Sequence, residues 1–278
     1  MTTSSCSVTF LVENTEAPGL RAEHGLSLWI ETPNGTILFD SGQSGTALLA
    51  NADHLGIDLD AAGTIVLSHG HYDHTGGLAQ ALTRNRHAAV IFHPEVFHQS
   101  FALREVAKPI GIPEACAAAL KALPPERLRP DAGPTEILPG IGTTGQVPRT
   151  SGFEDTGGPF FLDREGTRPD EIPDDQSLWF KTPGGLVVVT GCAHSGVVNT
   201  VRHAQAITGE SRIAGVIGGF HLVAASAERM DRTIRIFKDW GLDFIAPCHC
   251  TGQAAVARIR DEFGARAVAV ATGATIRF

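Results

Sequence analysis

Three histidines and one carboxylate lie within six residues of this chain, in the segment H-G-H-Y-D-H. Imidazole nitrogens and carboxylate oxygens are the usual ligands of a borderline metal such as zinc. His69 and His71 are two residues apart, so on extended backbone their side chains point to the same side. Asp73 and His74 follow on the next turn, where they are placed to bind a second ion. The segment therefore predicts a site for one or two divalent metals.

The residues on either side of this segment predict that it lies at the carboxyl end of a β-strand. An apolar run at 64–67 indicates a buried strand directly before it. Gly76 and Gly77 follow, and then Leu78, Ala81 and Leu82 recur at helical spacing. Open α/β sheets place their sites at the carboxyl ends of strands. A functional site is therefore favoured over a loop that is merely rich in histidine.

Other ligand candidates also follow predicted strands. A strand at 186–190 leads into Cys192 and His194, and strands at 213–217 and 244–246 lead into His221 and His249. Two histidines that end strands on the same sheet edge indicate a shared site, in which one completes the second metal and the other faces the substrate. Cys248-His249-Cys250 is not a zinc knuckle, because no second C-x-x-C pair completes it.

The H-x-H-x-D-H segment resembles the metal-binding signature of the metallo-β-lactamase superfamily, and the resemblance covers most of the chain. Asp40-Ser41-Gly42 is similar to the first motif of that family and His249 to the fifth. The resemblance implies an α/β fold, the four-layer αβ/βα sandwich, with two mixed β-sheets flanked by helices. It also implies that Asp40 supports the metal-binding loop by hydrogen bonding. The alternative for Asp40 is a cap of the next helix.

Two positions depart from the family pattern. Gln146 stands where the third motif has a histidine, and an amide oxygen is a weaker zinc ligand than imidazole. We therefore place Gln146 beside the metal that His69 and His71 bind. That metal site is expected to be weak or to take another ligand. Cys192 stands where the fourth motif has an aspartate. Resemblance to some β-lactamases implies that the Cys192 thiolate is a metal ligand. The alternative is that Cys192 is a small hydrophobic residue buried in the core. His249 is favoured as a ligand over His221.

The resemblance implies a hydrolase that uses a metal-bound hydroxide on a small-molecule ester, lactone or phosphoester. Asp73 would hold a metal and orient the nucleophile, and His221, with His194 as the alternative, would protonate the leaving group. Zinc is the expected ion, with manganese or iron as alternatives. Segments such as T-G-C-A-H-S-G and P-C-H-C-T-G resemble the branch named for a dihydropterin–ribofuranosylaminobenzene 5′-phosphate synthase. A pterin-pathway synthase and a metal-dependent oxidoreductase therefore stay open as alternatives.

Composition narrows the class of protein. With 42% hydrophobic and 19% charged residues, the 278-residue chain is typical of an enzyme with a sizeable core. No apolar run is long enough to span a membrane, and the polar start lacks the features of a signal peptide. The net charge of −8 argues against a nucleic-acid partner. An odd number of cysteines, three of them near other ligand candidates, indicates a reduced, cytoplasmic protein. The oligomeric state stays open.

Domain organisation is predicted as one domain over residues 1–278, with inserted segments at about 94–134 and 149–176 that cover the site. Within the first insertion, 94–106 is predicted to be helical and a short helix is expected at 115–123. The second insertion is rich in glycine, proline and aspartate and is expected to be a loop. Hairpins are expected around Pro33-Asn34-Gly35 and Pro183-Gly184-Gly185, and an amphipathic helix is expected over 227–240. A closing strand is expected near 268–270.

Overall fold

The computed structural model describes residues 5–278, which form two compact units. Unit 1 comprises Met1–Gln99, Pro109–Asp131 and Ala271–Phe278, and unit 2 comprises Ser100–Lys108 and Ala132–Val270. Residues 1–4, on which the expectation about a signal peptide partly rests, lie outside the described residues. Among residues 5–278, no helix is both long and apolar enough to cross a bilayer. The organisation as one domain stays a prediction.

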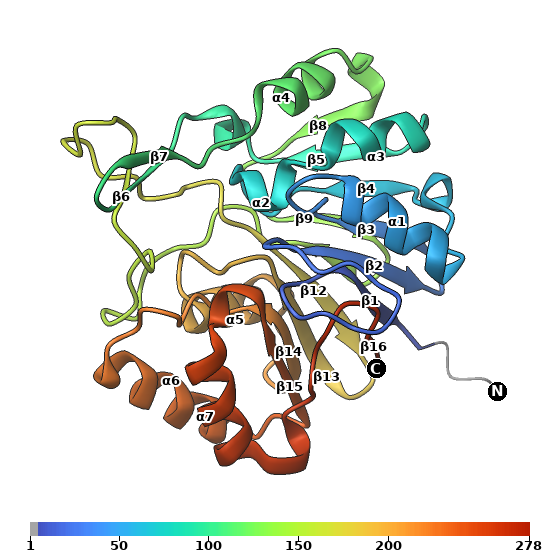
Figure 1. The fold of residues 1–278 in the computed structure, drawn as a ribbon. Helices are drawn as coiled ribbons and strands as arrows, with labels where there is room; N and C mark the ends of the chain where they lie inside the picture. The colour runs from blue at the N-terminus through green and yellow to red at the C-terminus, as the bar shows by residue number, and fades with distance from the viewer. Residues whose placement is uncertain (1–4) are drawn as a thin grey trace. The chain divides into compact units, whose positions relative to one another are not determined.

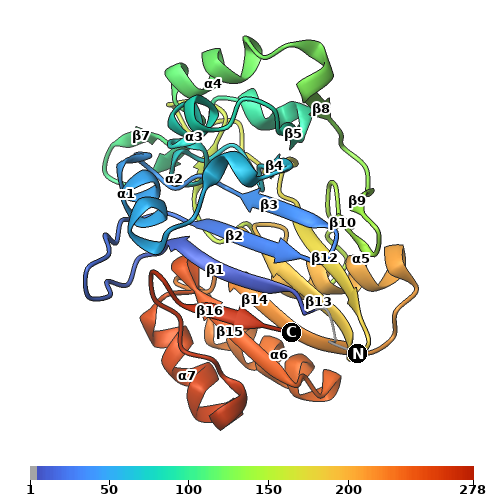
Figure 2. The ribbon, with the colours of Figure 1, turned by 90° about the vertical axis from the view of Figure 1, so that its right-hand side faces the viewer.

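Unit 1 is built on a seven-stranded mixed sheet in the order β16-β1-β2-β3-β4-β5-β8 (Figure 2). The strands from β16 to β3 pair antiparallel, and those from β3 to β8 pair parallel. Its elements are β1 (Ser7–Val12), β2 (Ser27–Thr32), β3 (Gly35–Phe39), α1 (Thr46–Leu55), η1 (Leu59–Ala61), β4 (Thr64–Val66), α2 (Tyr72–Thr75), α3 (Leu78–Arg84), β5 (Ala89–Phe92), η2 (Pro94–Phe97), α4 (Glu114–Lys121), η3 (Pro125–Arg127), β8 (Leu128–Pro130) and β16 (Thr275–Arg277).

The core of unit 1 lies between one face of this sheet and helices α1, α3 and α4. Trp29, Leu38 and Ile65 from three neighbouring strands are buried there with Leu48 of α1 and Leu78 of α3. Fully burying one large apolar side chain contributes about 1.5–3 kcal/mol, so this layer fixes the sheet under the helices. The parallel strands β3 and β4 consequently present their carboxyl ends at one edge.

Unit 2 is built on a six-stranded mixed sheet in the order β15-β14-β13-β12-β10-β9 and has a small sheet in the order β11-β6-β7. Strands β13, β14 and β15 are parallel neighbours. The elements are β6 (Phe101–Leu103), β7 (Ala107–Pro109, which ends at the unit boundary), β9 (Thr135–Leu138), β10 (Ile141–Thr143), β11 (Phe160–Phe161), β12 (Ser177–Thr182), β13 (Gly185–Thr190), α5 (Val197–Thr208), β14 (Ile213–Gly219), α6 (Ala227–Trp240), β15 (Phe244–Cys248), η4 (His249–Thr251), α7 (Gln253–Phe263) and η5 (Gly264–Arg266).

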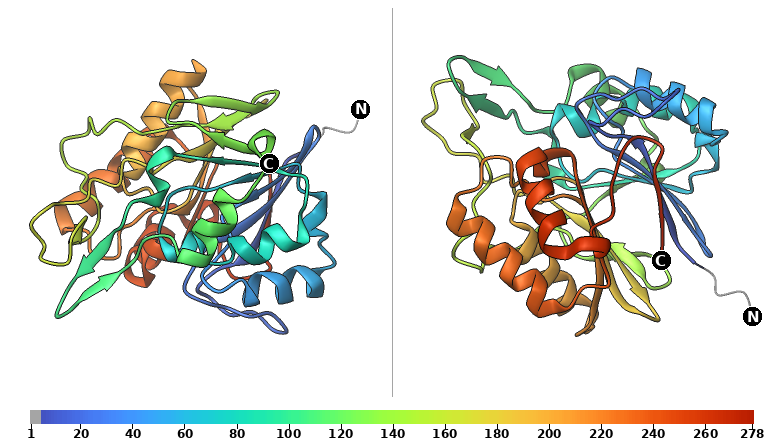
Figure 3. Two further views of the ribbon diagram at one scale, coloured as in Figure 1. Left: turned by 90° about the horizontal axis from the view of Figure 1, so that it is seen from above. Right: turned by 60° about the horizontal axis from the view of Figure 1, so that its bottom comes forward.

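Helices α5, α6 and α7 cover one face of the unit 2 sheet (Figure 1). Val188, Val216 and Ile245 of the three parallel strands are buried against Val201 of α5 and Ile234 of α6. Helices α6 and α7 lie side by side (Figure 3) and their apolar residues enter the same core. The parallel arrangement brings the carboxyl ends of three strands to one edge of the sheet.

The hairpins β2–β3 and β12–β13 have nearly the same sequence, S-L-W-[I/F]-x-T-P-x-G, and the same turn. Thr32 donates its hydroxyl proton to the Gly35 carbonyl at 2.7 Å, and Thr182 does the same to Gly185 at 2.7 Å. In each turn the amide two residues after the threonine donates to its hydroxyl oxygen. The first hairpin is followed by Asp40, and the second is followed by Gly191 and Cys192. The same local structure therefore precedes candidate site residues in both units.

The expected α/β fold class, with two mixed β-sheets and helices packed on them, is confirmed. Both predicted hairpins and the helix at 227–240 are also confirmed. In the first insertion, the short helix predicted at 115–123 is present as α4. In the second, only the two-residue strand β11 interrupts the predicted loop.

Two predictions about secondary structure are wrong. Residues 94–106 do not form a helix: after η2 the chain enters strand β6, because Phe101 and Ala102 pair with the distant strand β11. Residues 268–270 are not a regular strand. Val268 donates one hydrogen bond to Ile245, and the closing strand is β16, which pairs with β1 instead. In both cases pairing with a remote strand overrides the local pattern.

The turn after the H-x-H-x-D-H segment needs two glycines because it lies directly on the backbone that follows β3. A Cβ at Gly76 would come within 1.9 Å of the Gln43 carbonyl oxygen, and one at Gly77 within 2.1 Å of the Ser41 carbonyl oxygen. Gly76 has an ordinary helical φ of −68°, so space and not conformation requires glycine there.

Replacing Gly76 with alanine should destabilise unit 1, because the turn must move away from Gln43 to make room for the methyl group. We expect the free energy of unfolding to fall by about 1–3 kcal/mol, the usual cost of overpacking. Urea denaturation measures this. Gly63→Ala is the matched control, since its nearest neighbour would be 3.9 Å away. Equal stability of the two variants would contradict the packing argument.

Candidate metal centre

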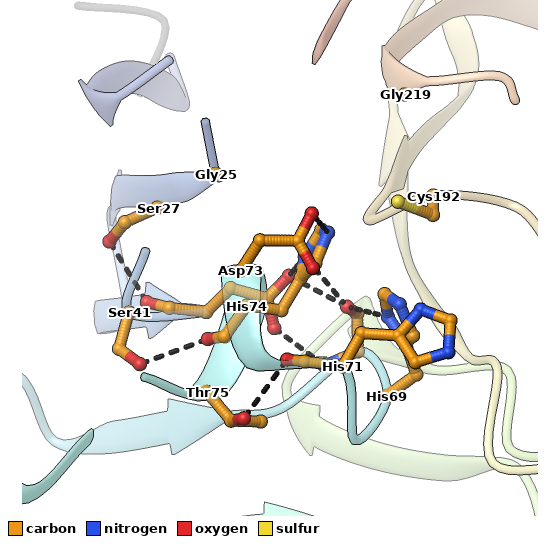
Figure 4. Close-up of polar contacts among 12 residues, drawn as sticks. Gly25, Ser27, Ser41, His69, His71, Asp73, His74, Thr75, Cys192 and Gly219 are labelled. Carbon is orange, nitrogen blue, oxygen red and sulfur yellow. Dashed lines mark hydrogen bonds and ion pairs between the residues drawn. The ribbon is translucent and has the colours of Figure 1, made fainter. Parts of the chain in front are cut away.

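The predicted metal ligands of unit 1 lie on the connection between β4 and α3 (Figure 4). His71 is extended and forms the N-cap of the short helix α2. The amides of His74 and Thr75 both donate to the His71 carbonyl at 3.0 Å, which closes the turn that carries Asp73. The chain thus places two histidines before the helical turn and an aspartate and a histidine on it, as the spacing predicted.

These four side chains form a compact buried cluster. The ring centroids of His69 and His71 are 4.5 Å apart, and those of His69 and His74 are 4.3 Å apart. Asp73 Oδ2 lies 3.8 Å from His74 Nε2. No member of the cluster is more than 7% exposed. Such a dense group of imidazoles around a carboxylate is the donor set that zinc prefers.

Asp40 holds this cluster from behind. Its Oδ2 atom accepts hydrogen bonds from His74 Nδ1 and Ser68 Oγ, both at 2.6 Å, and its Oδ1 accepts from the Ser68 amide at 2.7 Å. The Ser68 hydroxyl has one proton and donates it to Asp40, so at 2.9 Å it accepts from His69 Nδ1. Both histidines therefore carry their proton on Nδ1, and Nε2 is the atom that would bind metal.

The backbone of Asp40 is also unusual. Its φ of 61° lies in the left-handed region, which turns the chain sharply at the end of β3. Its amide donates to the Val66 carbonyl of the neighbouring strand β4 at 2.9 Å. The alternative that Asp40 caps the next helix is wrong, because α1 has Gly45 as its N-cap and no side-chain cap.

His24 is a neighbour of the cluster that was not among the predicted site residues. Its Nε2 atom lies 3.3 Å from Asp73 Oδ2, although the side chain is largely exposed. The next residue must be glycine, since a Cβ at Gly25 would come within 2.6 Å of the Asp73 carbonyl oxygen. The adjacent pair His24-Gly25 before a strand was the only local signal, because the contact joins segments that are distant in sequence.

In unit 2, the candidate residues follow the carboxyl ends of the parallel strands. Cys192 and His194 follow β13, His221 follows β14 and His249 follows β15. Three residues at these strand ends have positive φ without being glycine: Ala193 (53°), His221 (44°) and His249 (49°). Strained backbone of this kind concentrates at functional sites, and here it occurs at three adjacent strand ends.

Two groups of side chains form at this edge. The ligand atoms of Cys192, His249 and Cys250 all lie within 4.8 Å of one another. The ring centroids of His194 and His221 lie 4.3 Å apart. The proximity of two further donors favours the ligand interpretation of Cys192 over that of a buried small hydrophobe.

The loop at 149–176 covers the second group within unit 2. His194 Nδ1 lies 2.8 Å from the Thr156 carbonyl oxygen and therefore donates to it. The Phe160 ring meets the rings of His194 and His221 edge-on, at 5.3 and 5.9 Å between centroids. Gly157 packs so closely that a Cβ there would come within 2.0 Å of His221 Nδ1. The loop thus fixes the orientation of both rings.

Two carboxylates, the half-buried Glu154 and the buried Asp175, hold this loop and the strand end in place. Glu154 accepts the amide protons of Val198 and Asn199 at 2.9 Å each, at the first turn of α5. Asp175 accepts the amide proton of Ser195 at 2.8 Å. Burial raises the pKa of the Glu154 carboxyl and of the Asp175 carboxyl above their usual values.

Gln146, which the sequence analysis placed beside the metal, lies exposed on the turn after β10. Its amide donates to the Ala132 carbonyl at 2.9 Å. The positive φ of Gly145 (58°) sets the direction of this turn, and a Cβ at Gly145 would come within 2.3 Å of Gly133. A role of Gln146 beside a metal stays a prediction.

The family model of the metallo-β-lactamase superfamily matches residues 20–204. The chain belongs to this superfamily. This superfamily is metal-dependent. The clusters of histidine, aspartate and cysteine are the candidate metal sites of the chain.

Similar proteins add detail to this assignment. The chain is 34% identical to the 7,8-dihydropterin-6-methyl-4-(β-D-ribofuranosyl)-aminobenzene-5′-phosphate synthase of Methanocaldococcus jannaschii, over 87% of this chain and 85% of the relative. It is similar to the crystal structure of Tm1679, a metal-dependent hydrolase of the β-lactamase superfamily, with TM-score 0.82, 30% identity and 98% of each chain covered. The YhfI protein of Bacillus subtilis, at 13% identity and TM-score 0.59, shares the fold over 99% of this chain and 100% of its own.

Replacing Asp40 with asparagine should weaken metal binding, because His74 loses the carboxylate that fixes its proton on Nδ1. We expect zinc affinity to fall about 10–100-fold, as is usual when such a hydrogen-bond partner is removed. Asparagine tolerates the left-handed backbone, so the fold should persist. Competition with a chromophoric chelator measures the affinity. The exposed Asp53→Asn serves as control, and a Kd equal to that of the control would refute the role of Asp40.

Proposed function

We propose that the protein is a metal-dependent hydrolase of a small-molecule ester, lactone or phosphoester. The observation that carries this proposal is the Asp40–Ser68 network, which sets His69 and His74 in the tautomer that binds metal. Histidines that serve only packing do not need a hydrogen-bond network that keeps the proton of both rings on Nδ1. The similarity to Tm1679, a metal-dependent hydrolase, supports the reaction class.

The proposed metal ligands are the four clustered residues of unit 1, His69, His71, Asp73 and His74, and from unit 2 Cys192 and His249. Zinc suits this mixture of imidazole, carboxylate and thiolate, with manganese or iron as alternatives. When bound, such an ion acts as a Lewis acid and lowers the pKa of a bound water to about 7. That both units serve the same metals stays a prediction from the sequence.

The proposed catalytic residues divide the remaining work. Asp73, with His24 at 3.3 Å and His74 at 3.8 Å, is the acceptor that would orient the attacking water. His221 would donate the proton that the leaving group needs. His194 is the alternative donor, although its Nδ1–H is already given to Thr156, which leaves Nε2 as an acceptor. The covering loop would limit access of water to these groups.

A second candidate function is supported by one comparison. The relative from Methanocaldococcus jannaschii is named as a pterin-pathway synthase, and the alignment covers most of both chains. The same donors could serve a condensation instead of a hydrolysis, since one fold and one site support many reactions. Turnover measured with a panel of esters, lactones and phosphoesters, and in parallel with dihydropterin and aminobenzene phosphate substrates, distinguishes the hydrolase from the synthase. Iron in protein purified without added metal would favour an oxidoreductase instead.

Partner and location are proposed on the same basis. We propose a small-molecule substrate and a cytoplasmic location, with neither nucleic acid nor membrane as partner. The net charge of −8 supports the absence of a nucleic-acid partner, and the five free cysteines support the cytoplasmic location.

Replacing His71 and Asp73 together with alanine should abolish metal binding by the unit 1 cluster and all metal-dependent turnover. The reason is that one imidazole and the only carboxylate of the cluster are lost. Elemental analysis after gel filtration measures the metal, which should fall from the one or two equivalents usual for such sites. His87 and Asp60 form a matched exposed pair, and their double alanine variant should bind as wild type. Full occupancy in the His71/Asp73 variant would rule out the proposed site.

Replacing His221 with alanine should leave the metal in place and slow turnover by about 10²–10⁴-fold, the usual contribution of a general acid. The loss should be greatest for substrates with poor leaving groups, because these need the proton most. A series of phenyl esters or phosphates with graded leaving groups, with metal content measured in parallel, checks this. The exposed His98→Ala is the control. Loss of metal would instead identify His221 as a ligand.

A further inference from the structure

Cys250 is the third member of the donor group that it forms with Cys192 and His249 at the strand ends of unit 2. It lies in the short helix η4, next to His249, and its side chain returns to the end of β13. The Cys250 thiol donates to the Cys192 carbonyl oxygen at 3.6 Å. Its sulfur, the Cys192 sulfur and a ring nitrogen of His249 lie within 4.8 Å of one another. The three donors follow the ends of β13 and β15, which flank β14.

The local backbone is arranged to bring Cys250 into this position. A Cβ at Gly219 would come within 2.6 Å of the Cys250 sulfur and 2.4 Å of the Gly191 carbonyl oxygen. The end of β14 must therefore lack a side chain so that the sulfur can pass over it. The positive φ of His249 (49°) begins the turn that carries Cys250. Two unusual backbone features thus support one side-chain position.

The surroundings of the three donors distinguish them from cysteines that serve only packing. Cys192 is 3% exposed and His249 is 7% exposed, whereas Cys250 is half-buried and accessible to an entering ion. Thiolate and imidazole together select thiophilic divalent ions, and two cysteines with one histidine are a known three-ligand set for zinc that leaves a fourth position open.

We propose that Cys250 is a metal ligand and that Cys192, His249 and Cys250 together bind a thiophilic divalent ion such as Zn²⁺. This inference deepens the proposed function, on which it rests, by adding a ligand that a one-cysteine site does not have. Two thiolates neutralise the charge of the ion, so it is a weaker Lewis acid than one held by neutral imidazoles.

Co²⁺ is the probe that tests this assignment on the full-length protein. Each thiolate bound to Co²⁺ adds a sulfur-to-metal charge-transfer band in the near ultraviolet. Under reducing conditions wild type should show the band, and Cys250→Ser should lose about half of it, because one of two thiolates is removed. The affinity for Co²⁺ should fall at least about tenfold, as expected for a lost ligand. Cys248→Ser, next to the same histidine, is the matched control and should keep the full band.

A second measurement needs no substitution and so does not depend on how a variant folds. With one equivalent of Zn²⁺ bound, alkylation followed by mass spectrometry should find Cys250 protected at least about tenfold relative to metal-free protein. Cys6, which is also partly exposed, should react equally in both states. A full band in Cys250→Ser, or equal alkylation of Cys250 with and without zinc, would overturn the inference.

These outcomes are separable from failure of the proposed function. If metal binds and substrates turn over while Cys250→Ser keeps the full cobalt band, the added ligand is wrong and the hydrolase stands. If the band halves as expected but no substrate is hydrolysed with Zn²⁺, Mn²⁺ or Fe²⁺ loaded, the ligand is right and the hydrolase assignment is wrong.

Discussion

The hydrogen bond between Asp40 and His74 is the interaction on which the candidate metal site of unit 1 depends. Both side chains are completely buried, and the two atoms are 2.6 Å apart. In surroundings of low polarity such a charge-assisted bond is strong, and an unpaired carboxylate would be costly. The same carboxylate accepts hydrogen bonds from the amide and the hydroxyl of Ser68. The residue directly after β3 therefore holds both the start of the H-x-H-x-D-H segment and its last histidine.

Both units prepare their candidate residues in the same physical way. Parallel strands bring their carboxyl ends to one edge, and a residue in the left-handed region, Asp40 in unit 1 or Ala193, His221 and His249 in unit 2, turns the chain sharply there. Closely approached glycines such as Gly76 and Gly157 let backbone and ring pack without intervening side chains. The packing of the buried sheets offsets the backbone strain at these residues. The donor side chains are therefore already positioned without a bound ion.

Local sequence patterns were sufficient for much of the fold. Alternation and apolar runs predicted both hairpins, and periodicity predicted helix α6 over its full length, because these elements bury one face along a regular repeat. The errors fell where partners are remote in sequence. Residues 94–106 carry a helical pattern, yet Phe101 and Ala102 pair with β11, and the chain end pairs with β1 in place of a strand at 268–270.

For the site, the sequence by itself determined which chemistry is present: the spacing H-x-H-x-D-H places four donors on one short connection, whatever surrounds them. The role of Asp40 beside this connection was implied by the family motif, and the structure shows that the bond joins Asp40 Oδ2 and His74 Nδ1. Only the tertiary structure decided that His24 faces Asp73 and that Cys250 reaches Cys192. These contacts join residues far apart in the chain, and they depend on strand order and on backbone turns with positive φ, neither of which has a local signature in residue spacing.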